Sequence, residues 1–149
     1  MESAQLGAEV AAALGILLQR RVRSRLYGRL TEGLDPALDE TTYPVISGLE
    51  RYGPLSAADL GARIGIDRSV TTRRASRLEA AGLIGRTPDA RDRRAILLEL
   101  TDAGRGHVQT MRARLAGILG GYLATWPPGQ AEAFAAGLRR FTADGPFVR

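Results

Sequence analysis

The stretch SAADLGARIGIDRSVTTRRASRLEAAG, residues 56–82, contains the signals of two helices separated by a tight turn. It opens with Ser-Ala-Ala-Asp, a capping pattern at a helix N-terminus, so a first helix is expected over residues 57–64. Gly65-Ile66 then forms the turn, and Asp67 or Ser69 is expected to cap a second helix that ends just before the glycine at position 82. Two helices joined by so short a turn predict a helix-turn-helix.

The second helix has two different faces when its residues are placed at ~100° per residue. Thr71, Ala75 and Leu78 fall on one side and are expected to pack. The other side carries arginines and small hydroxyls, which suit a major groove because arginine binds guanine edges and small side chains permit close approach. A merely solvated face is the alternative for an isolated helix, but the second position in a helix-turn-helix favours DNA. The predicted DNA-facing residues are Arg68, Ser69, Thr72, Arg73, Ser76 and Arg77.

A charged turn between two apolar runs follows in the segment RTPDARDRRAILLELT, residues 86–101. Strands are predicted over Ile84–Thr87 and Ala95–Leu100, which makes the segment a β-hairpin. The hairpin is predicted to be the wing of a winged helix, because it follows directly on a helix-turn-helix, and its tip is Asp89–Arg94. Three arginines at this tip are predicted to contact DNA: Arg91, Arg93 and Arg94.

Helical spacing of apolar residues predicts more helices on both sides of this unit. Residues Ala4–Leu30 read as one long amphipathic helix, and Thr42 is expected to cap a short helix with Pro44 in its first turn. Thr101 is expected to cap a helix after the hairpin, and a last helix is predicted near Gly129–Phe141. The predicted fold is mainly α with a small β-hairpin wing.

The distribution of charge points to a nucleic acid. All 21 basic residues are arginine, and the formal net charge is +5. The stretch from Arg63 to Arg94 holds nine arginines and four acids. Its formal net charge is therefore +5, which equals that of the whole chain. The positive field is therefore concentrated on the predicted winged helix, and double-stranded DNA is the expected partner.

Other classes of protein fit the sequence poorly. There is no cysteine and His107 is the only histidine, so neither thiolate catalysis nor a His/Cys metal site is expected. No glycine-rich phosphate loop is found, and no enzymatic activity or cofactor is predicted. The apolar run Val10–Leu18 is too short to span a bilayer, and acids precede it while arginines follow it, the reverse of a secretory signal. We therefore expect a cytoplasmic protein without a membrane partner.

Three motifs at these spacings resemble the MarR family of bacterial transcription regulators: Leu-Glu-Ala-Ala-Gly-Leu-Ile at 78–84, Asp-Arg-Arg at 92–94 and Leu-Thr-Asp-Ala-Gly at 100–104. The match covers about Thr41–Arg105 in motif and nearly the whole chain in layout. The resemblance implies a winged helix-turn-helix over residues 41–101, flanked by N- and C-terminal dimerisation helices within residues 1–32 and 102–149.

The resemblance also implies a function. It predicts a homodimeric repressor that places its two winged helices in successive major grooves of a pseudo-palindromic operator. Carried over to this chain, Arg94 enters the minor groove, where narrow A·T-rich DNA attracts arginine, and Asp92 orients it.

Two features stay open at the level of sequence. Some members of the family bind phenolic ligands in a crevice, for which Tyr27, Tyr43 and Trp126 are weak candidates here, although such aromatics are more often core residues. A small-molecule effector is thus a partner that the resemblance allows. The alternative function is a winged helix that binds proteins without touching DNA, which the arginine-rich helix face and wing disfavour.

Overall fold

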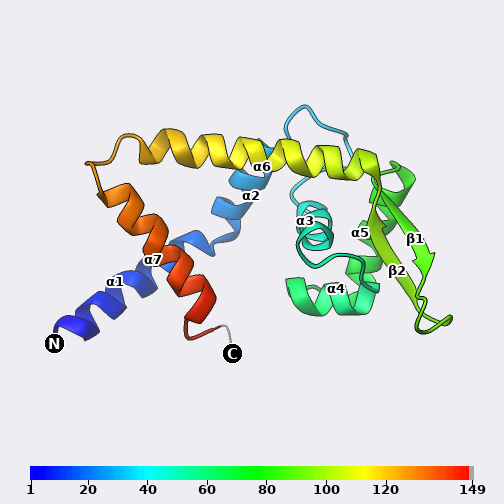
Figure 1. Ribbon diagram of the computed structural model, residues 1–149, viewed down its shortest axis with the longest axis horizontal. Helices are drawn as coiled ribbons and strands as arrows, with labels where there is room; N and C mark the ends of the chain where they lie inside the picture. Colours follow the sequence, from blue (N-terminus) through cyan, green and yellow to red (C-terminus); the bar gives the residue numbers. More distant parts are fainter. Residues whose placement is uncertain (148–149) are drawn as a thin grey trace. The chain divides into compact units, whose positions relative to one another are not determined.

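The computed structural model describes residues 1–147, and in that range five helices precede a β-hairpin and two follow it (Figure 1). The contacts divide the chain into one unit that ends at Arg112 and a second that begins at Ala113, within the sixth helix. The elements are α1 (Glu2–Leu17), α2 (Arg20–Thr31), α3 (Tyr43–Tyr52), α4 (Ala57–Ile64), α5 (Arg68–Ala80), β1 (Ile84–Pro88), β2 (Ile96–Leu100), α6 (Asp102–Leu123) and α7 (Gln130–Asp144).

The helix-turn-helix predicted from residues 56–82 is present as α4 and α5. The Ser56 hydroxyl accepts the Asp59 backbone N–H at 3.1 Å, so the predicted cap is confirmed. Gly65 ends α4 in the left-handed region at φ +71°, which glycine adopts without a steric penalty. Asp67 precedes α5 as its N-cap residue, but its side chain makes no capping hydrogen bond.

Gly61 allows α4 and α5 to approach each other closely. A Cβ atom at this position would lie 2.5 Å from the carbonyl oxygen of Ile66 and 2.9 Å from the Thr71 hydroxyl. Around this contact the core of the winged helix is built from side chains of every element between α2 and α6. Its buried apolar members are Leu30, Leu38, Val45, Ile46, Leu49, Leu60, Ala75, Leu78, Leu83, Ile84, Leu98, Val108 and Met111.

The predicted wing is confirmed as an antiparallel hairpin of β1 and β2. Ile84 pairs with Leu100 at its base, and Pro88 pairs with Ile96 at its outer end. Leu55, just before α4, forms an isolated bridge to Leu98, so the hairpin is hydrogen-bonded to the segment that leads into the helix-turn-helix. The Thr101 hydroxyl accepts the Gly104 N–H at 3.1 Å, as expected of a cap for α6.

Two local predictions are wrong. The single long helix expected over Ala4–Leu30 is divided into α1 and α2, because Gln19 is extended (φ −60°, ψ 135°). Neither Leu18 nor Gln19 is a helix breaker, so local propensity does not predict the break. The C-terminal end of α2 is anchored by the fully buried Leu30, whereas no residue of α1 is buried, and the two segments are therefore free to differ in direction.

The side chain of Thr42 also differs from prediction. It precedes α3 but makes no cap hydrogen bond to that helix. Its hydroxyl instead donates to the Ala37 carbonyl at 2.6 Å and accepts the Asp39 N–H at 3.0 Å. The reason is that Thr42 is fully buried against the α2–α3 loop. The Ala37 carbonyl and the Asp39 N–H of that loop need hydrogen-bond partners, and the Thr42 hydroxyl supplies them.

The second unit holds the later turns of α6 and all of α7. α7 extends three residues beyond the predicted end at Phe141. Trp126 contacts both Tyr122 and Phe134, with ring centroids 5.9 and 5.2 Å away. No residue of α7 is buried. Of the helices in the described part of the chain, none combines the length and the apolar character needed to cross a membrane.

Candidate nucleic-acid interface

Helix α5 presents the face that the sequence predicts. Thr71, Ala75 and Leu78 are fully buried, which confirms the packed side. On the other side Arg68, Ser69, Arg73, Ser76 and Arg77 are exposed, and Thr72 is half-buried. No large apolar side chain interrupts this surface, so the helix offers hydrogen-bond donors and a small profile to a groove.

The arginines of the winged helix fall into two groups. Arg77 is paired with Asp39, Arg86 is paired with Glu79, and the guanidinium of Arg63 lies 4.9 Å from the centroid of the Tyr52 ring. Within residues 1–147 the other six form no ion pair with a carboxylate, and their charges stay available for phosphates. These six are Arg68, Arg73, Arg74, Arg91, Arg93 and Arg94.

Arg86 connects the wing to α5. Its Nε donates to the Glu79 carboxylate at 2.6 Å, and its second terminal nitrogen donates to the Ser76 hydroxyl at 3.2 Å. Ser76 in turn donates to the Thr72 carbonyl at 3.0 Å, so both its donor and one acceptor position are occupied within the protein. These hydrogen bonds fix the start of the wing against α5.

Arg77 is held by the loop between α2 and α3. One terminal nitrogen donates to the Asp39 carboxylate at 2.8 Å and the other to the Thr41 hydroxyl at 3.1 Å. Burial alone would raise the pKa of Asp39, but hydrogen bonds from the Thr41 hydroxyl, from Arg77 and from the Thr41 and Thr42 backbone hold that pKa well below its usual range. The carboxylate is therefore ionised at any pH at which DNA binding is measured.

The wing tip consists of two consecutive turns, each stabilised by an aspartate. The Asp89 carboxylate accepts the Arg91 backbone N–H at 2.9 Å, and the Asp92 carboxylate accepts the Arg94 backbone N–H at 3.0 Å. Asx turns of this kind shape the backbone. In the described structure no ion pair joins Asp92 to a wing arginine, so its contact to Arg94 is with the backbone and not with the guanidinium.

A pocket of about 450 Å³ lies beside this surface, and we call it the arginine pocket. Three arginines contribute to it, Arg20 and Arg23 from α2 and Arg74 from α5. Its remaining lining residues are Ser24, Tyr27, Glu40, Thr41, Pro44, Ile64, Gly65 and Ile66. The ring of Tyr27 stacks on that of Tyr43 with centroids 4.4 Å apart, whereas Trp126, the third aromatic candidate, belongs to the second unit.

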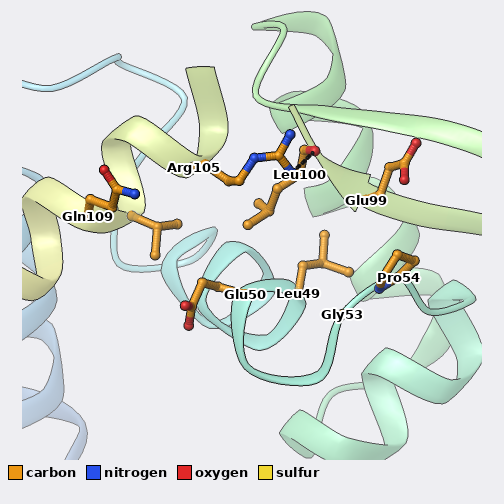
Figure 2. A pocket seen from close by; sticks show the side chains of 9 residues that line it. Leu49, Glu50, Gly53, Pro54, Glu99, Leu100, Arg105 and Gln109 are labelled. Carbon is orange, nitrogen blue, oxygen red and sulfur yellow. Dashed lines mark hydrogen bonds between the residues drawn. The ribbon is translucent and has the colours of Figure 1, made fainter. Parts of the chain in front are cut away.

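A second pocket, of about 280 Å³, lies between α3, the end of β2 and the first turns of α6 (Figure 2). None of the residues predicted to bind DNA lines it. Arg105 at its rim donates to the Leu100 carbonyl at 3.0 Å, and Glu50 is paired with Arg112 at 2.6 Å. Its polar groups thus mainly serve contacts within the protein.

Comparison with known proteins agrees with this geometry. A model described as MarR family matches residues 33–95. The HTH-type transcriptional repressor MdtR of Bacillus subtilis is 32% identical over 125 residues, which cover 83% of this chain and 78% of that protein. The structure of the YusO protein from Bacillus subtilis aligns with a TM-score of 0.62 at 29% identity, covering 92% of this chain and 96% of that one.

A third similar protein is Bordetella bronchiseptica BpsR, whose structure concerns regulation of its DNA binding by 6-hydroxynicotinic acid. It has a TM-score of 0.59 and 26% identity, covering 87% of this chain and 98% of that one. The fold, the arginine-lined surface and these relatives define a winged-helix, DNA-binding transcription regulator. The chain belongs to the MarR family.

Sequence reasoning missed the partners of Arg77 and Arg86 and the arginines of the pocket. Asp39 lies 38 residues from Arg77, and no local pattern indicates that they meet. Arg20 and Arg23 are two of several arginines on α2, and only the tertiary structure, which places them in one pocket with Arg74, distinguishes them. The Asx turns of Asp89 and Asp92 in the wing could have been inferred from the spacing of these aspartates to Arg91 and Arg94.

Proposed function

We propose that this protein is a homodimeric repressor that reads a pseudo-palindromic operator with α5 and the wing of each copy. The observation that carries the proposal is the group of six arginines that form no ion pair within the described residues. Five of them are exposed on the winged helix, and Arg74 is half-buried. The five exposed ones are the predicted contacts Arg68, Arg73, Arg91, Arg93 and Arg94. Ser69 and Thr72 lie on the same face of α5 as Arg68 and Arg73. Repression is the activity named for the relative MdtR.

The homodimer is supported by apolar surface that a monomer leaves in water. Helix α1 has no buried residue, and Leu6 and Val10 on it are about half exposed. In the second unit Phe134 and Leu138 of α7 are exposed to a similar degree. Exposed apolar surface of this extent is typical of a protein–protein interface. A second copy of the chain is the proposed partner, because a dimer has two winged helices and can bind both half-sites of an operator.

Selection of DNA from a random pool tests this function. The purified protein is expected to enrich duplexes with two inverted half-sites about one helical turn, ~34 Å, apart. Mass measurement of the selected complex should give two protein chains per duplex. Enrichment of a single half-site by one chain would contradict the proposed homodimer, and no enrichment at all would contradict sequence-specific DNA binding.

Two variants of α5 should then separate base reading from phosphate binding. Arg73→Ala is expected to weaken the selected duplex by ~1–3 kcal/mol while changing random DNA little, because a guanine contact is lost. Arg68→Ala, at the helix start, is expected to weaken both duplexes alike and to reduce the slope of log K against log salt by about 0.9. Equal losses on both duplexes for Arg73→Ala would remove it from base reading.

The arginine pocket supports a small aromatic acid as effector. Arg20, Arg23 and Arg74 supply donors for a carboxylate, while Tyr27 and Ile64 supply an apolar wall for a ring. The ligand named for BpsR, 6-hydroxynicotinic acid, has this chemistry. Because residues of both α2 and α5 line the pocket, an occupied pocket would change the position of α5, the helix proposed to bind the major groove, and release the operator.

Thermal unfolding with 6-hydroxynicotinic acid or benzoate tests the effector site. At about 100 times its Kd, a ligand is expected to raise Tm by at least about 5 °C. The rise should disappear in Arg23→Gln and persist in Arg25→Gln, a change of the same charge on the same helix outside the pocket. If both variants respond as the wild type does, the ligand binds elsewhere.

A further inference from the structure

The two carboxylate oxygens of Asp39 have separate partners. Oδ1 accepts the backbone N–H groups of Thr41 and Thr42 at 2.8 and 3.0 Å, and the Thr41 hydroxyl at 2.6 Å. Oδ2 accepts Arg77 at 2.8 Å. One oxygen therefore holds the α2–α3 loop in shape, and the other holds an arginine of α5.

Both terminal nitrogens of Arg77 are occupied by this loop. The second one donates to Thr41, which is itself held by Asp39, so the guanidinium is fixed by a fork of two hydrogen bonds. Arg73, one turn earlier on the same helix, has no carboxylate partner in the described part of the chain. The two arginines lie on neighbouring parts of one exposed surface, but only the charge of Arg77 is balanced by a carboxylate, that of Asp39.

This pairing has a consequence for DNA binding. A phosphate contact strengthens binding to every sequence and adds about 0.9 to the salt slope. The side chains of Arg77 and Asp39 keep 45% and 39% of their exposure, so a phosphate could reach the guanidinium if the carboxylate released it. A carboxylate that stays ionised competes with the phosphate for the same donors.

We propose that Asp39 is a positioning residue that holds Arg77 on the protein and keeps it from forming a phosphate contact. The inference rests on the proposed DNA-binding function and revises one contact expected from the sequence. Asp39 thereby lowers the affinity for all DNA and makes the complex easier to dissociate.

The test uses Asp39→Asn in the full chain. Asparagine keeps Oδ1 for the loop but replaces Oδ2 with an NH₂ group, which cannot accept from Arg77. Asp35→Asn is the matched control, because Asp35 lies in the same loop, its Oδ1 accepts the Ala37 N–H at 2.8 Å, and the charge changes equally. Affinity for a random-sequence duplex is measured over a series of KCl concentrations.

Asp39→Asn is expected to bind this duplex roughly 3- to 10-fold more tightly at low salt, with the salt slope steeper by about 0.9. Asp35→Asn should keep the wild-type slope. Adding Arg77→Gln to Asp39→Asn should restore the wild-type slope, and Arg77→Gln alone should leave the slope unchanged. A merely structural role of Asp39 would instead lower the affinity on substitution.

Either of two results overturns the inference. One is an Asp39→Asn slope equal to that of Asp35→Asn, and the other is a flatter slope for Arg77→Gln alone, which would show that Arg77 reaches a phosphate in the wild type. The Arg77→Gln measurement can overturn the inference even if Asp39→Asn does not fold. Failure of the proposed function looks different, because the wild type itself would then show no salt-dependent binding.

Discussion

Gly104→Ala should lower the free energy of unfolding by roughly 3 kcal/mol, because a methyl group is forced into fixed backbone. A Cβ atom at position 104 would overlap the carbonyl oxygen of Leu83. That carbonyl accepts the Thr101 N–H at 3.1 Å, and the Leu83 N–H donates to Leu78 at 2.9 Å. The Leu83 peptide therefore cannot move away without breaking hydrogen bonds that join α5, β1 and the start of α6.

The matched control lies two residues further along the same helix. Gly106→Ala places its Cβ where no other atom lies within 4 Å, so it should stabilise the protein by up to ~1 kcal/mol through helix propensity. Thermal unfolding should show Gly104→Ala melting ~6–12 °C below the wild type and Gly106→Ala at or above it. Similar melting temperatures for the two variants would contradict the close approach of α6 to Leu83.

Arg94→Ala should weaken binding to the selected operator by ~1–3 kcal/mol, or roughly 5- to 150-fold, if this arginine enters the minor groove. The structure places Arg91 and Arg94 in equivalent turns, each two residues after an aspartate that accepts its backbone N–H. Geometry alone does not distinguish the two arginines, and the preference for Arg94 comes from the family pattern. Arg91→Ala is therefore the matched control, expected to reduce the salt slope with a smaller loss of affinity.

The A·T content of the duplex makes this comparison sharper. A narrow minor groove attracts an inserted arginine, so the loss in Arg94→Ala should shrink when the A·T pairs beneath the wing are replaced with G·C pairs. The loss in Arg91→Ala should not depend on that replacement. The opposite pattern would identify Arg91 as the residue in the groove.

Much of the winged helix could be predicted because its signals are local. The Ser56 cap, the Gly65 turn and the alternating run after Arg94 each act over a few residues, and the structure confirms all three. The buried face of α5 followed from helical periodicity alone. Prediction failed at Gln19, where the unburied helix α1 ends and α2, anchored by the buried Leu30, begins. It also failed at the Thr42 side chain, which is buried and satisfies the backbone of the α2–α3 loop.

The positions of arginines and acids along the sequence are enough to place a net charge of +5 on residues 63–94, and the spacing of capping residues and glycines predicts the order of helix, turn, helix and hairpin. Which arginines keep their charge available depends on the tertiary structure. Arg77 and Arg86 are as basic in sequence as Arg73, yet packing brings Asp39 and Glu79 against them and leaves Arg73 without such a partner in the described structure. The physical reason is range, since helix and turn signals act between near neighbours, whereas an ion pair forms wherever folding places two charges within hydrogen-bond distance.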